Sequence, residues 1–308
     1  MNKKILFFLL PLLCFLLAAP EEAASASANG VNLWFHTVLP TLLPFIILSD
    51  LLISGGASFS LPERADRICR LLTGFSSAGC YILALGFFCG FPMGANLSAS
   101  FFRSGRISEG EARRLLCLSN QVSPLFLQGY IAALLPDAGL LPAILGIYYG
   151  TALLLLFLSR LRPISRESAF CVLHAQKKEA SLSLGERMDA SIMNGFEIIT
   201  RLGGYIILFS VCGALLQTLT AQIPLLPPVL SLFLEISSGS SLLLQSHLAH
   251  SLGLALLTAG LSFGGISTVI QTASVIRGSG LPLRIYVGAK LLQACTAFFL
   301  SLFFFAVV

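Results

Sequence analysis

The 308-residue chain is 56% hydrophobic and only 11% charged, with a mean hydropathy of +0.88. A soluble domain needs about a quarter of its residues charged to cover its surface, so the composition excludes a soluble fold. The net charge of +5 does not indicate a nucleic-acid partner, because the positive residues follow a pattern that membrane topology explains.

The N-terminal segment, residues 1–28, resembles a signal peptide. Lys3 and Lys4 precede a short apolar stretch, Ile5–Ala19, and small residues follow it. This order is typical of a secretory leader. The same stretch could instead remain as an N-terminal anchor, and the sequence leaves open whether residues 5–19 are cleaved.

A series of apolar segments follows, and most are long enough to cross a bilayer. About 20 helical residues span a hydrocarbon core of about 30 Å. The segments are Leu33–Ile53, Phe75–Phe102, Leu115–Leu135, Leu140–Leu158, Ile192–Gln217, Pro228–Gln245, Leu252–Ile276 and Ile285–Val308. The sequence therefore predicts an all-α, multi-pass protein of the cell membrane, surrounded by the lipid bilayer.

The distribution of Lys and Arg predicts how these segments thread through the membrane, since cytoplasmic loops hold most of them. Arginines flank Phe75–Phe102 on both sides, so this segment should enter and leave from the cytoplasm as a re-entrant hairpin. No Lys or Arg occurs from Leu202 to Ile276, so Pro228–Gln245 should be a hairpin entering from outside. On this threading all nineteen Lys and Arg residues lie at or near the cytoplasmic side, and Lys290 is expected to snorkel there.

The threading divides the chain into halves that mirror each other across the membrane plane. Residues 29–158 and residues 191–308 each comprise a span, a hairpin and two further spans, and a basic cytoplasmic loop at 159–190 joins them. Asn-Gly dipeptides at 29–30 and 194–195 support the pairing. Inverted repeats with interrupted helices are typical of secondary transporters. The alternative is a duplicated helical scaffold that carries no cargo.

Helix-breaking or polar segments lie in the middle of both predicted hairpins. In Gly90–Asn96, Gly and Pro free backbone N–H groups that can bind an anion or a polar group, unless the segment is only a close-packed turn. The second hairpin contains Glu235–Ser241, and Glu235 is the only carboxylate in a long apolar stretch. A charge at the bilayer centre costs at least about 3 kcal/mol. Glu235 is therefore a candidate for cation binding, proton transfer or substrate pairing; a protonated carboxyl bonded to a neighbouring Ser is the alternative.

The span after each hairpin is also interrupted, at Ser119–Pro124 and at Ser262–Ser267. Both segments place hydroxyl or amide groups on a discontinuous helix, although Ser and Thr can also simply bridge helices. The predicted substrate-binding residues come from the hairpins and these breaks: Gly90, Pro92, Gly94, Asn96, Ser119, Asn120, Ser123, Glu235, Ser237, Ser238, Gly239, Gly264, Gly265 and Ser267. Glu235 is also the candidate coupling-ion site.

Enzymatic chemistry is not expected. The sequence shows no nucleophile–base set, no phosphate-binding loop and no His-rich cluster. The eight cysteines form no CxxC pair, so neither a metal site nor a cofactor is predicted.

Several segments resemble the YlbJ-type sporulation integral membrane proteins, which carry the nucleoside-recognition or gate domain. The segments are Trp34–Pro44, Gly90–Asn96, Arg103–Arg114, Ser119–Phe126, Gly203–Ser210, Glu235–Gly239 and Gly264–Gln271. The resemblance implies a fold similar to that of concentrative nucleoside transporters and a role in endospore formation, at the outer forespore membrane. Members of this family are linked to moving dipicolinic acid from the mother cell to the forespore.

We therefore expect a transporter of a small carboxylate, with dipicolinate as the first candidate. A non-transporting assembly factor for spore maturation and a nucleoside transporter are the alternatives. Homo-oligomerisation is left open.

Overall fold

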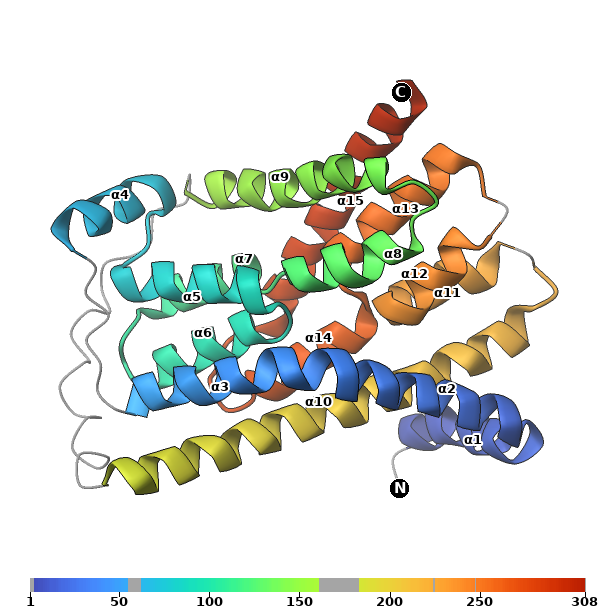
Figure 1. The fold of residues 1–308 in the computed structure, drawn as a ribbon, viewed down its shortest axis with the longest axis horizontal. Helices are drawn as coiled ribbons and strands as arrows, with labels where there is room; N and C mark the ends of the chain where they lie inside the picture. The colour runs from blue at the N-terminus through green and yellow to red at the C-terminus, as the bar shows by residue number, and fades with distance from the viewer. Residues whose placement is uncertain (1–2, 55–61, 161–182, 224, 247, 308) are drawn as a thin grey trace.

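The computed structural model describes residues 3–54, 62–160, 183–223, 225–246 and 248–307, and every regular element in them is helical. Most helices run along a common direction (Figure 1). Within the described residues, four helices are long and apolar enough to cross a membrane, or up to six if each bent helix pair forms one span. The predicted all-α, multi-pass membrane protein is confirmed at this level.

The N-terminal region forms two helices joined at a sharp bend. Helix α1 (Lys3–Ala18) meets α2 (Pro20–Leu33) at 111°. Helix α2 continues through a π-helical turn, η1 (Trp34–Val38), into α3 (Leu39–Ser54). The predicted boundary at residue 28 therefore falls inside a helix.

The first predicted hairpin is present as α5 (Ser77–Cys89) and α6 (Met93–Arg103), which lie side by side. An amphipathic helix, α4 (Glu63–Thr73), precedes it at a 70° bend. Gly90 ends α5 with a φ of +84°, a conformation that favours glycine.

The segment after the first hairpin is interrupted where the sequence predicts a break. Helix α7 (Glu109–Leu118) ends before Ser119, and the helical path resumes with η2 (Phe126–Ile131) and α8 (Ala132–Leu134). The short 3₁₀ turn η3 (Ala138–Leu140) leads into α9 (Leu141–Arg160).

The second half begins with α10 (Leu184–Thr220). This helix starts at Leu184 rather than at residue 191, because Ser183 and Glu186 form a capping box there. Most of the predicted 159–190 loop, residues 161–182, lies outside the described residues. The remaining helices are α11 (Leu226–Leu234), α12 (Ile236–Leu244), α13 (His250–Phe263), α14 (Gly265–Val275) and α15 (Leu283–Val307).

The second hairpin is formed by α11 and α12, which also lie side by side. The two hairpins begin at opposite ends of the bundle and point toward its middle (Figure 1). At the end where the first hairpin begins, the Arg114 guanidinium donates to Thr73 O at 3.3 Å and that of Arg160 donates to Leu72 O at 3.3 Å. Arginines from α7 and α9 therefore meet the end of α4, as expected for a cytoplasmic face.

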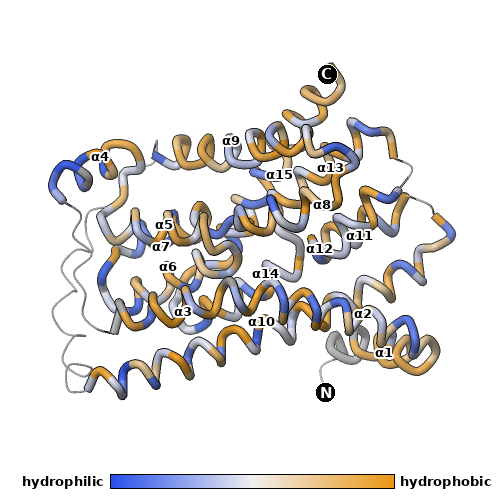
Figure 2. The backbone as a smooth tube through the Cα atoms, viewed as in Figure 1, coloured by the Kyte–Doolittle hydropathy of each residue, from blue (hydrophilic) through white to orange (hydrophobic). Residues whose placement is uncertain are grey.

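The outer faces of the helices are apolar. Hydrophobic residues predominate along most helices (Figure 2). On α15, Phe299 and Phe303 are 67% and 75% exposed, and on α9 Phe157 is 61% exposed. Such exposure of large apolar side chains is suited to lipid rather than to water.

Candidate functional site

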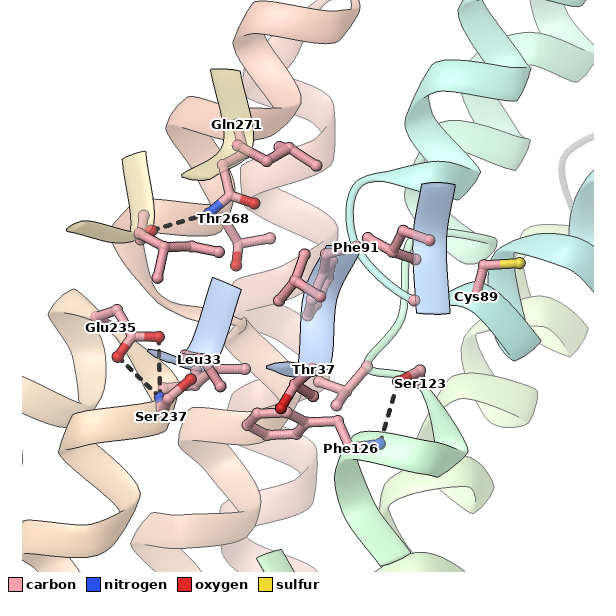
Figure 3. A pocket seen from close by; sticks show the side chains of 18 residues that line it. Leu33, Thr37, Cys89, Phe91, Ser123, Phe126, Glu235, Ser237, Thr268 and Gln271 are labelled. Carbon is pink, nitrogen blue, oxygen red and sulfur yellow. Dashed lines mark hydrogen bonds between the residues drawn. The ribbon is translucent and has the colours of Figure 1, made fainter. Parts of the chain in front are cut away.

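A cavity of about 100 Å³ lies where both hairpin tips meet both helix breaks (Figure 3). Helices α2, α3 and α10 and the turn η1 close its remaining walls. The lining residues are Leu33, Thr37, Val38, Leu42, Cys89, Gly90, Phe91, Val122, Ser123, Phe126, Leu202, Ile206, Glu235, Ile236, Ser237, Ser267, Thr268 and Gln271. Segments far apart in the sequence thus form one enclosure.

The tip of the first hairpin is held by backbone contacts with the break after α7. A Cβ atom on Gly90 would lie 2.9 Å from Ser123 N, and one on Gly94 would lie 2.4 Å from Ser119 O. No ordinary side chain fits at these distances, so glycine lets the hairpin approach the break this closely. Gly94 and Ser119 therefore serve close packing, which was the alternative for this segment.

The tip of the second hairpin is organised by one carboxylate. Glu235 is 6% exposed and is the N-cap residue of α12. Its Oε1 accepts from Ser237 N at 2.9 Å, and its Oε2 accepts from Ser238 N at 2.9 Å and from Ser238 Oγ at 3.0 Å. A helix N-terminus stabilises a negative charge. The bond to a neighbouring Ser considered from the sequence is present, together with two backbone N–H donors.

The second break fits against both hairpin tips. Gly264 and Gly265 adopt φ values of +86° and +80° between α13 and α14. A Cβ on Gly264 would lie 2.7 Å from the Phe91 ring, and one on Gly265 would lie 3.0 Å from Leu234 O. Beyond these glycines, Gln271 Nε2 donates to Ser267 Oγ at 3.0 Å at the cavity wall (Figure 3).

The predicted site residues divide into those that line the cavity and those that do not. Gly90, Ser123, Glu235, Ser237 and Ser267 line it. The others are buried or half-buried but are not part of its lining: Pro92, Gly94, Asn96, Ser119, Asn120, Ser238, Gly239, Gly264 and Gly265. The binding role of each residue stays a prediction.

Asn120 connects the two halves of the molecule. Its Nδ2 donates to Thr272 Oγ1 at 2.9 Å and lies 3.0 Å from Tyr286 OH. Its Oδ1 accepts from Ala95 N at 3.4 Å. The side chain therefore joins the first break to α14, α15 and the first hairpin, rather than facing the cavity.

The expectation that Lys290 snorkels to the cytoplasmic face is wrong. Its side chain is fully buried, with Nζ 3.0 Å from Gln121 Oε1 and 3.2 Å from Gln293 Oε1. The reason is that Lys290 lies on the buried face of α15, together with Tyr286 and Gln293. Their spacing of four and three residues around Lys290 puts all three on one face, a signal that could have predicted an interior polar stripe.

Sequence reasoning also missed the apolar wall of the cavity. Leu33, Phe91, Phe126 and Ile206 line it, but apolar residues within apolar segments give no signal that separates a cavity wall from a lipid-facing surface.

The fold and the site define a multi-pass α-helical membrane protein in which two helical hairpins meet at a small cavity. The chain is 28% identical, over an alignment of 323 positions, to the "Sporulation integral membrane protein YlbJ" of Bacillus subtilis (strain 168). The alignment covers 94% of this chain and 79% of that protein. This similarity bears out the resemblance to the YlbJ-type proteins that the sequence segments indicate. No family model matches the chain, and no solved structure matches it.

Proposed function

We propose that this sporulation-associated membrane protein transports a small carboxylate, with dipicolinate as the first candidate cargo. The observation that carries the proposal is the enclosure itself, since both hairpin tips and both helix breaks line one cavity. Secondary transporters hold their cargo near the midplane at such interrupted helices. In this proposal the protein is not an enzyme and uses no cofactor.

An inverted repeat similar to that of concentrative nucleoside transporters is part of the proposal. The paired Asn-Gly dipeptides support it, because each glycine lies in the interface between the two long helices. A Cβ on Gly30 of α2 would lie 2.9 Å from Ile207 Cα of α10, and one on Gly195 of α10 would lie 2.9 Å from Ile47 Cγ1 of α3. The glycine of α2 thus packs against α10, and the glycine of α10 packs against α3. Two inverted repeats predict such a reciprocal pair of contacts.

The cavity is small for a cargo of this class. Ligand pockets commonly measure about 300–1,000 Å³, whereas this cavity measures about 100 Å³. Loading a ring with carboxylate groups therefore requires a hairpin tip to move. The side chains that would have to move include two aromatic residues, since Phe91 and Phe126 both line the cavity (Figure 3).

The test is uptake of labelled dipicolinate into proteoliposomes that hold the purified chain, with and without a pH gradient. We expect uptake above that of empty liposomes, lost in Glu235→Gln and kept in Glu197→Gln. Glu197 is the matched control because it is an exposed carboxylate paired with Arg201. Absence of uptake by folded, inserted protein would contradict the dipicolinate proposal and favour a nucleoside cargo or the assembly-factor alternative.

A further inference from the structure

Lys290 is the centre of a buried polar cluster that neither hairpin supplies. The described charged residues that are buried are Glu111, Glu235 and Lys290. Both carboxylates cap helix N-termini, with Glu111 accepting from Ser76 N at 2.7 Å beside α5. Lys290 instead lies between the amide groups of Gln121 and Gln293. In the part of the chain that the structure describes, no carboxylate lies within ion-pairing distance of it.

The cluster has more donors than acceptors. Gln121 Oε1 faces Lys290 Nζ at 3.0 Å, Tyr148 OH at 2.9 Å and Gln293 Nε2 at 3.2 Å. An amide oxygen offers only two lone pairs. Tyr148 OH accepts from Val122 N at 2.6 Å, and its own donor adds to those directed at Gln121 Oε1. An additional acceptor would complete this cluster.

Among the described residues, a protonated Lys290 has one donor position for which no oxygen acceptor is found. An ammonium group carries three N–H donors, and the amide oxygens of Gln121 and Gln293 accept two. A further neighbour is the ring of Phe91, whose centroid lies 5.3 Å from Nζ. A ring face attracts a cation more weakly than a carboxylate does in a desolvated site. Because burying a charge without compensation costs several kcal/mol, this position favours an anion.

Phe91 also provides the route to the cluster. The same ring that covers Lys290 lines the cavity and lies near its middle (Figure 3). Val122, the neighbour of Gln121 in the chain, lines the cavity too. Displacement of one side chain at the first hairpin tip would therefore open the cluster to the cavity.

We propose that Lys290, Gln121 and Gln293 form a carboxylate-binding subsite, covered by Phe91 in this structure and exposed to cargo when the first hairpin tip moves. Gln121 comes from the first half of the chain, and Lys290 and Gln293 come from the second. This proposal rests on the proposed transport function. In it, Lys290 is the residue that distinguishes a carboxylate cargo from a neutral cargo of the same shape.

The test compares dipicolinate with its dicarboxamide, which keeps the ring and shape but carries no negative charge. Binding to the purified full chain is measured for the wild type, Lys290→Met, Lys290→Arg and Arg284→Met. Arg284 is the matched control because it is an exposed cation on the same helix. We expect the wild type and Arg284→Met to prefer dipicolinate, Lys290→Arg to keep part of that preference, and Lys290→Met to lose about tenfold or more of it.

The two failures are distinguishable. Transport by the wild type with an unchanged preference for dipicolinate over its dicarboxamide in Lys290→Met overturns the subsite and leaves the proposed function intact.

If the wild type transports no dipicolinate, a series of small carboxylates and matching carboxamides is tested by thermal stabilisation. Carboxylate stabilisation that disappears in Lys290→Met supports the subsite, and no such stabilisation overturns it. If Lys290→Met does not fold, Phe91→Ala is used: uncovering Lys290 should raise carboxylate affinity, and no change overturns the proposal.

Discussion

The two hairpin tips meet at one cavity but are built in different ways. The first is shaped by its backbone, since Gly90 and Gly94 touch the break after α7 with no room for a side chain. The second is shaped by the side chain of Glu235, which closes onto the start of its own α12. The second hairpin is also closely packed at a glycine, since a Cβ on Gly239 would lie 2.2 Å from Leu232 Cα. Added volume should therefore damage both hairpins, whereas changed hydrogen bonding should damage the second tip most.

The largest effect on stability among the changes proposed below is expected from adding one methyl group to the first hairpin. In Gly94→Ala the new Cβ would meet Ser119 O at 2.4 Å. Backbone atoms cannot rotate away, so we expect a loss of about 3 kcal/mol in the free energy of unfolding, at the upper end of overpacking costs. The measurement is thermal unfolding in detergent.

The matched control is Gly146→Ala in α9, where nothing lies within 4 Å of the new atom. That change should stabilise the helix by about 0.5–1 kcal/mol, because alanine loses less backbone entropy than glycine does. Equal stability of the two variants would show that the hairpin does not approach the break as closely as described.

The next effect concerns the link between halves at Asn120. Asn120→Ala leaves the buried groups of Thr272 and Tyr286 without this partner, so we expect a loss of about 2 kcal/mol in the free energy of unfolding. A double-mutant cycle with Thr272→Val measures the coupling directly. A coupling energy of zero would mean that this bond does not hold the halves together.

Replacing Glu235 should have a smaller effect on stability and a larger one on activity. Glu235→Ala removes the cap of α12, which costs about 1 kcal/mol. If Glu235 is the coupling site, uptake should be lost although the protein remains folded in the membrane. Glu235→Asp separates the two roles, because it keeps the negative charge but shortens the side chain. The cap of α12 should survive in this variant, whereas uptake should fall because the carboxylate is displaced. Normal uptake by Glu235→Ala would rule out coupling at this residue.

Much of the fold could be predicted because charge and helix-breaking residues act locally. Arginines on both sides of Phe75–Phe102 predicted a hairpin, and α5 and α6 form one. Ser119–Pro124 and Ser262–Ser267 predicted breaks in the following spans, and α7 and α13 end at these segments. In both cases the physical cause lies within a few residues of its effect.

The site was less predictable because it depends on which side of each helix faces inward. Lys290 lies near Arg284 in the sequence, and a long flexible side chain can either reach the interface or turn inward. The polar face of α15 favours the inward direction, and packing against Gln121, 169 residues away in the chain, fixes it. The bonds of Asn120 to Thr272 and Tyr286 were hidden for the same reason.

The smallest effect on stability is expected from replacing an exposed carboxylate, and this effect is the reference for the cost of replacing Glu235. Glu197 and Arg201 form an i,i+4 ion pair at 2.6 Å, but their side chains are 67% and 49% exposed. Solvent screens such a pair, so Glu197→Ala should cost at most about 0.5 kcal/mol, and this cost should vanish at high salt. Unfolding of both variants at low and high salt tests this. A cost for Glu197→Ala as large as that for Glu235→Ala would mean that the cap at the second tip contributes no more than a surface pair, and the comparison of the two tips would then rest on the glycines alone.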